Sequence, residues 1–300
     1  MCNDGKTEGH PVFQLADKVS ETTNALLKEF NSRNIKLKGL SPHHRIFLFF
    51  ITRAIKTFSA IKILCQKGYG QDIATLLRGL LENLISVKYI LSDPKSADHK
   101  AVRFVEYKWI IFRRYLPDER EEVSQVTDPL QQELISKKTL ITDKIKEFKE
   151  KYNITSDRAL ITWSGRSVRD MARMIDKKWM GEYDSTFRLS SRFSHPSIIG
   201  DREYMNQEDN NLIFYPFPSM TGVLTNLRIA IYYLYEYLLL MNELLNLDFA
   251  EKLKSLKGEI DRVVHAEENE KKADDSHHAT AGLHRSKGDD IIIKFQEPSK

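Results

Sequence analysis

The strongest constraint on the fold comes from two segments, 71–91 and 221–246, in which apolar residues cover nearly every side at helical spacing. A helix that is hydrophobic all round belongs in the centre of a fold. The first segment also carries Arg78 and Glu82, four residues apart and therefore on one face. An unpaired buried charge is costly, so these two side chains must satisfy each other or a ligand. We therefore expect two central helices with a polar cluster between them.

Apolar residues recur at helical spacing elsewhere, and no segment alternates with period two for long enough to indicate a sheet. The class is therefore all-α, a single multi-helix bundle. Residues 1–10 are polar and expected to be disordered, 11–265 form one helical domain, and 266–300 form a disordered tail. The Lys- and Glu-rich stretch at about 129–152 predicts a charged helix that projects from the core. The predicted helices span about 11–33, 41–67, 71–91, 96–115, 129–152, 168–177, 182–195, 221–246 and 248–265.

Charge and cysteine content exclude several classes of protein. The 300 residues include 46 basic and 42 acidic side chains, a net charge of +4 that permits contact with phosphates without demanding it. Two cysteines are too few for a disulfide framework or a cysteine zinc site. The apolar segments 46–64 and 223–247 contain charges that a spanning helix avoids, and the N-terminus lacks the apolar run of a secretory signal. We expect a soluble cytoplasmic protein with no membrane contact, no metal and no cofactor.

One stretch, 183–197, brings together arginines, hydroxyls and a histidine: Y-D-S-T-F-R-L-S-S-R-F-S-H-P-S. Arg188 and His195 lie two helical turns apart and point the same way, Ser191 lies one turn before His195, and Arg192 is close by. A histidine moves protons near neutral pH, and a guanidinium binds a phosphate through two nitrogens. These side chains are the parts that RNA cleavage without a metal requires, with Arg188 and His195 as the catalytic pair.

This spacing resembles the arginine-any-four-to-six-histidine motif of HEPN ribonucleases. The resemblance implies an all-α fold, a homodimer with the active site across its interface, RNA or a nucleotide as partner, and a role in stress or phage defence. The sequence departs from the motif at Leu189, where the family usually has a polar residue, and at Pro196, directly after the histidine.

A second resemblance, to an uncharacterised all-α bacterial family, covers about 46–237. It implies the fold and no activity, and it places Arg78, Glu82, Tyr183, Ser191 and His195 in one site, to which Arg192 is added by its position. The segments that carry it are R-G-L-L-E-N-L at 78–84, Y-I-L-S-D-P at 89–94, W-S-G at 163–165 and Y…S…H-P-S within 183–197.

Structural roles compete with each functional one. Arg78 and Glu82 could instead form a structural ion pair in the helical core, and His195 could instead cap the end of its helix. Arg188 and Arg192 fit a solvated face equally well. The alternative function is therefore a non-enzymatic helical protein that binds a small ligand or protein partner through its polar cluster. Metal-assisted hydrolysis is disfavoured because the chain lacks a Glu-x-x-His pair.

Overall fold

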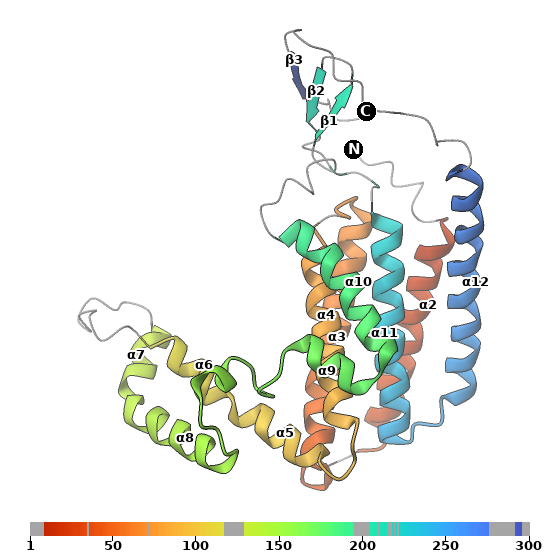
Figure 1. Ribbon diagram of the computed structural model, residues 1–300. Helices are drawn as coiled ribbons and strands as arrows, with labels where there is room; N and C mark the ends of the chain where they lie inside the picture. The colour runs from red at the N-terminus through yellow and green to blue at the C-terminus, as the bar shows by residue number, and fades with distance from the viewer. Residues whose placement is uncertain are drawn as a thin grey trace. The chain divides into compact units, whose positions relative to one another are not determined.

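Helices account for most of the chain that the structure describes, as the all-α prediction requires (Figure 1). For 37, 130, 158, 188–194, 205–208, 211–213, 264–275 and 292–295 the description covers the backbone alone. The computed structural model describes residues 9–34, 36–70, 72–116, 129–194, 205–208, 211–214, 218, 220, 222–275 and 292–295.

The chain divides into two compact units. Helical periodicity shows which face of each helix is apolar, but it does not show which faces pack together, so the division cannot be read from the sequence. The first unit contains residues 1–40, 47–84 and 181–300, and the second contains 41–46 and 85–180.

In the first unit, α2 (Pro11–Ser32) packs against α11 (Val223–Leu245) and α12 (Ala250–Asp275), and α11 packs against α12 (Figure 1). Helix α11 ends at Asn246, which takes the left-handed conformation (φ 49°) typical of a residue just past a helix. Arg33 donates from Nη1 to the Asn246 carbonyl at 2.7 Å and so joins the ends of α2 and α11.

The two segments predicted to be central form α4 (Ala74–Leu91) and α11, and both bury long apolar stripes. Helix α3 (Pro42–Gln66) exposes Arg53 and Lys56, which explains how an apolar helix carries two cations. None of the described helices is long and apolar enough to cross a membrane. Side chains of the two central helices that are at most 1% exposed are Leu77, Leu80, Leu81, Leu84, Ile231, Tyr233, Leu234, Tyr237 and Leu238.

Helix α10 (Lys177–Ser194), which carries most of the predicted site, starts before the expected residue 182. Its first turn is capped by Asp176, whose Oδ1 accepts a hydrogen bond from the Trp179 backbone N–H at 2.9 Å. A carboxylate at this position satisfies a backbone donor that the helix leaves unpaired.

The second unit contains the charged stretch that was predicted as a projecting helix. That stretch forms two helices, α7 (Pro129–Ser136) and α8 (Lys138–Lys151), joined at Lys137, and α6 (Lys108–Arg114) packs against α8. Of the apolar residues in this stretch, Leu134, Ile141, Ile145 and Phe148 are buried, whereas Leu140 is 45% exposed. The elements of the unit are α5 (Ala97–Glu106), α6 (Lys108–Arg114), α7 (Pro129–Ser136), α8 (Lys138–Lys151), η3 (Asp157–Leu160) and α9 (Val168–Ile175).

A small three-stranded sheet was not predicted. Strand β1 (Met205–Glu208) pairs antiparallel with β2 (Asn211–Phe214), Met205 opposite Phe214, and β2 pairs in parallel with β3 (Ile292–Phe295), Asn211 opposite Ile292. Strands of four residues are too short for a period-two pattern to stand out. Strand β3 and the end of α12 fall within the predicted tail 266–300, and the other residues of that tail lie outside the described ones.

Candidate functional site

An ion pair on α4 forms the first part of the candidate site. Arg78 and Glu82 lie one turn apart, and Nε of Arg78 donates to Oε1 of Glu82 at 2.8 Å. Their side chains are 29% and 32% exposed, so the pair reaches solvent rather than being sealed in the core. With the residues that the structure describes, the guanidinium makes no other hydrogen bond, which leaves Nη1 and Nη2 for a ligand.

Helix α10 supplies an aromatic stack against this guanidinium. The Arg78 Cζ atom lies 4.3 Å from the centroid of the Phe187 ring, and Phe187 in turn stacks on Tyr183 with centroids 4.8 Å apart and planes 22° apart. A guanidinium is attracted to the face of an aromatic ring and stays planar against it. Arg78 is therefore oriented by a carboxylate on its Nε edge and by a ring on its face.

A short chain of hydrogen bonds joins α10 to α11 beside this stack. The Tyr233 hydroxyl donates to Oε2 of Glu182 at 3.3 Å and lies 2.6 Å from Oγ1 of Thr186, which is 4% exposed. Because the phenol has a single proton, the Thr186 hydroxyl donates in the shorter contact. Burial raises the pKa of Tyr233, so the phenol remains a donor at neutral pH.

Two carboxylates make the α10–α11 contact acidic. Glu236 of α11 is buried, and it follows Arg228 and Tyr232 at four-residue spacing on one face of that helix. Burial, followed by the negative charges of Glu236 and Glu182, raises the pKa of Tyr232. Arg228, on the same face of α11, balances one of these two negative charges.

The structure brings together part of the predicted site. Arg78, Glu82 and Tyr183 meet through Phe187. Arg188, Ser191 and Arg192 belong to α10 by their backbone. Position 191 lies one turn beyond position 187, on the face that carries Phe187. His195 lies outside the described residues.

Sequence reasoning missed the roles of Phe187, Thr186, Glu182 and Tyr233. Phe187 follows Tyr183 at four-residue spacing, which signals an aromatic stripe. No local sequence pattern predicts that this stripe lies against Arg78 or that Thr186 contacts Tyr233, because these contacts depend on how α4, α10 and α11 pack together.

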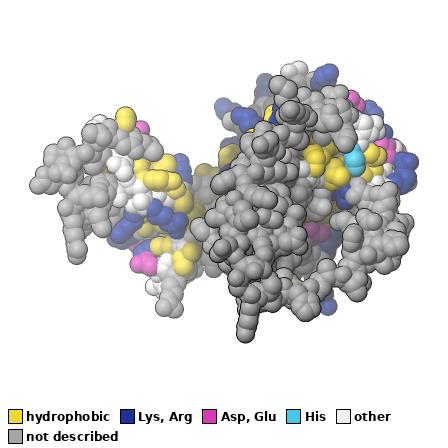
Figure 2. All heavy atoms as spheres, turned by 90° about the horizontal axis from the view of Figure 1, so that it is seen from above, with side chains coloured by type: hydrophobic (Ala, Val, Ile, Leu, Met, Phe, Trp, Pro, Cys, Tyr) yellow, Lys and Arg dark blue, Asp and Glu magenta, His cyan; other side chains and the backbone are white. Residues whose placement is uncertain are grey.

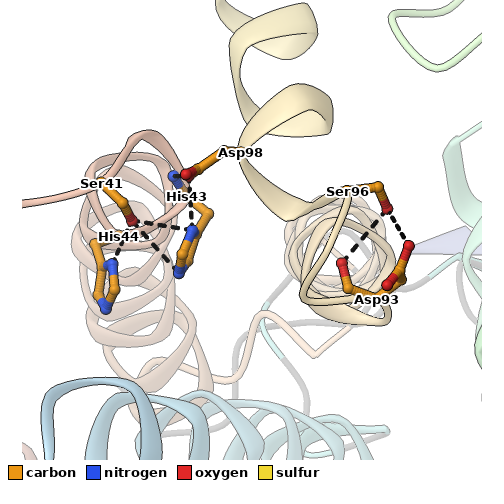
Figure 3. A network of polar contacts seen from close by, with 6 residues as sticks. All are labelled: Ser41, His43, His44, Asp93, Ser96 and Asp98. Atoms are coloured by element: carbon orange, nitrogen blue, oxygen red, sulfur yellow. Dashed lines mark hydrogen bonds and ion pairs between the residues drawn. The ribbon is translucent and has the colours of Figure 1, made fainter.

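A second polar network lies at the start of α3, in the second unit (Figure 3). Ser41 Oγ is 2.9 Å from Nδ1 of His43 and 2.5 Å from Nδ1 of His44. Asp98 Oδ1 lies 2.7 Å from Nδ1 of His43 and accepts from its backbone N–H at 3.1 Å. A carboxylate at a helix N-terminus is stabilising, so the network anchors α3 to α5. In the described part of the chain, no group of three His, Cys, Asp or Glu side chains is arranged to hold a metal.

The fold and these contacts define a helical protein with an oriented arginine and an aromatic stack on two neighbouring helices. The chain belongs to the family of unknown function DUF5677, whose profile matches residues 44–212. The match confirms the uncharacterised family expected from the sequence, and it includes Arg78, Glu82, Tyr183 and Phe187. No curated protein matches the chain. No solved structure matches it either.

Proposed function

We propose that this protein binds a phosphate-bearing ligand, RNA or a nucleotide, at the surface that α4 and α10 form. The supporting observation is the Arg78 guanidinium, which Glu82 and Phe187 orient before any ligand arrives. A fixed guanidinium with two nitrogens to spare suits two-point contact with a phosphate. Pre-orientation also reduces the side-chain entropy that binding costs.

The aromatic pair gives the ligand a second point of attachment. Phe187 and Tyr183 form a stack on α10 directly beside the Arg78 guanidinium. Proteins that bind single-stranded RNA stack bases on such side chains, at about 1–3 kcal/mol per base. A phosphate at Arg78 with its base near Tyr183 is the arrangement we expect.

Arg188 and His195 are the proposed catalytic pair for RNA bound there. In metal-independent cleavage the ribose 2′-oxygen attacks phosphorus, a P–O bond to the ribose 2′-oxygen forms, and the bond to the 5′-oxygen breaks. His195 takes the 2′-hydroxyl proton and a proton is returned to the leaving 5′-oxygen. Arg188 stabilises the negative charge that develops on the phosphate oxygens.

Fluorescence anisotropy with a labelled single-stranded RNA tests the binding half. Arg78→Ala removes a charge-assisted contact of about 1.5–3 kcal/mol, so affinity falls roughly 10- to 150-fold. Arg173→Ala is the matched control, because Arg173 makes a similar ion pair with Asp170 at 2.6 Å on α9. Equal loss in both variants, or in neither, rules out the α4–α10 surface as the RNA site.

Cleavage is tested separately, with RNA incubated in the presence of a chelator. The proposal expects products ending in a 2′,3′-cyclic phosphate, with activity lost in His195→Ala and Arg188→Ala while both variants still bind RNA. If the wild-type chain binds ligand through Arg78 and leaves every RNA intact, the protein is the non-enzymatic ligand-binding helical protein that the sequence also allows. If it neither binds nor cleaves, both proposals fail.

A further inference from the structure

A cavity lies in the second unit. It encloses about 390 Å³ between α6, α8 and the segment that begins with η3. Ligand sites in proteins typically start at about 300 Å³. Its charged lining residues are Arg113 and Arg114 at the end of α6, Lys149 on α8, and Asp157 on η3.

Arg114 is fixed in the wall of this cavity. Its Nη2 donates to the Tyr107 hydroxyl at 2.8 Å and to the carbonyl oxygens of Leu160 and Ile161 at 3.1 Å each. Tyr107 is 7% exposed, and its single hydroxyl proton is shared between the same two carbonyl oxygens. Only one of the guanidinium nitrogens is used in these contacts, so the group is oriented while its remaining N–H donors can serve a ligand.

The other cations share a single carboxylate. Nζ of Lys149 lies 2.8 Å from Oδ1 of Asp157, whose side chain is 86% exposed. The hydrogen bond and charge of Lys149 lower the pKa of Asp157, and the charge of Arg113 adds to the effect. Asp157 is thus the internal anion that a ligand would replace.

The cavity combines a positive excess with apolar walls. Three cationic side chains and one carboxylate line the cavity, a net of two positive charges, and Ile110 and Ile145 line it at 6% and 5% exposure. In Figure 2 the part of the molecule that carries α6–α8 shows Lys and Arg side chains beside hydrophobic ones. A phosphate monoester carries about −1.5 to −2 charges at pH 7, which matches this excess better than a monoanion does.

We propose that this cavity binds a phosphate monoester with an apolar or aromatic body, at a site separate from the α4–α10 surface. The phosphate lies against Arg113, Arg114 and Lys149, displacing Asp157, and the organic body lies against Ile110 and Ile145.

Calorimetric titration of the full chain with phenyl phosphate tests this site. Phenyl phosphate is expected to bind more tightly than inorganic phosphate, which lacks the apolar body, and than phenyl sulfate, which has the shape but only one charge. Affinity is expected to weaken as the pH falls below about 6, where the phosphate monoester gains a proton, and as salt is raised. Equal affinity for the three probes overturns the proposal.

Variants locate the binding. Arg113→Gln and Lys149→Gln are each expected to lower the affinity for phenyl phosphate roughly 5- to 10-fold, because each variant loses about one charged contact. Asp157→Asn is expected to strengthen it, because the competing carboxylate loses its charge. Lys144→Gln, on α8 in an exposed pair with Glu147, is the matched control and is expected to bind like wild type.

Two outcomes overturn the assignment. If Arg113→Gln and Lys149→Gln both bind phenyl phosphate with wild-type affinity, the phosphate does not contact these side chains in the cavity. Loss of phenyl phosphate binding in Arg78→Ala, with Arg113→Gln unaffected, moves the ligand to the α4–α10 surface. Arg114→Gln is a weaker test because Arg114 also holds the carbonyl groups of Leu160 and Ile161, so the other two variants decide the result.

Discussion

Removing the Tyr233 hydroxyl tests whether hydrogen bonds between α11 and α10 hold α10 in the position that the candidate site requires. Tyr233 is fully buried, and its hydroxyl is shared between Thr186 and Glu182 of α10. Tyr233→Phe keeps the ring and its packing, so no cavity of a side chain's size appears. It leaves the buried Thr186 hydroxyl without its acceptor and takes a donor from the Glu182 carboxylate.

The expected cost follows from these two losses. A buried polar group left without its partner costs about 1–3 kcal/mol, and bonds to charged groups lie at the upper end. The 3.3 Å contact with Glu182 is long, so we expect about 1–3 kcal/mol for the substitution as a whole. In a domain of 150–250 residues each kcal/mol lowers the melting temperature by about 2–4 °C. The predicted shift is therefore a decrease of roughly 2–12 °C.

Thermal and urea unfolding followed by circular dichroism measure this loss. Tyr115→Phe is the matched control, because Tyr115 is 54% exposed and the loss of an exposed hydroxyl is expected to change stability by less than about 0.5 kcal/mol. Adding Thr186→Val to Tyr233→Phe removes the stranded hydroxyl, so the double variant is expected to lose less than the sum of the single losses. Strict additivity, or a Tyr233→Phe protein as stable as wild type, refutes the hydrogen-bond chain.

Burial raises the pKa of Cys65 to about 12, so in a Cys2→Ser variant an Ellman assay is expected to detect no thiol in the native protein and one in denaturant. Phe148 on α8 is 3% exposed, and Phe148→Ala is expected to lower the free energy of unfolding by about 3–5 kcal/mol. Leu140→Ala, at a position 45% exposed, is expected to lower it by less than about 0.5 kcal/mol. Urea unfolding measures both losses. Burial also raises the pKa of tyrosines on α11. Their stabilising contribution is fully present below the unfolded pKa of about 10 and is lost as the pH rises further. Absorbance at 295 nm is expected to show them ionising together with unfolding, and separate early ionisation contradicts their burial.

Much of the helical architecture could be predicted because its signals are local. The apolar stripe of 71–91 and the glycine just past α3 lie within a turn or two of the residues they govern. That glycine, Gly68, takes the left-handed conformation (φ 77°) typical of a helix end. The start of α10 was missed although its cap is also local. Asp176 accepts from the backbone three residues on, and a single Asp before a lysine pair is a weak signal beside the aromatic pattern that begins later.

Some residues of the candidate site could be predicted from the sequence, but the contacts between them could not. Arg78 and Glu82 could be paired from sequence because their spacing on one helix brings them together. Tyr183 could be grouped with them only by resemblance. The residue that joins them, Phe187, was not predicted for the site, since aromatic spacing indicates that a face is buried and not what lies against it.

Sequence by itself determines where this chain is helical and which faces of those helices avoid water, because periodicity and capping act over a few residues. Tertiary structure alone decides that Phe187 of α10 lies against Arg78 of α4 and that Thr186 meets Tyr233 of α11. It also decides that α6, α8 and η3 enclose a cavity with a positive excess. The physical reason is that many pairings of apolar faces bury similar area, and the packing of all the helices together selects among them.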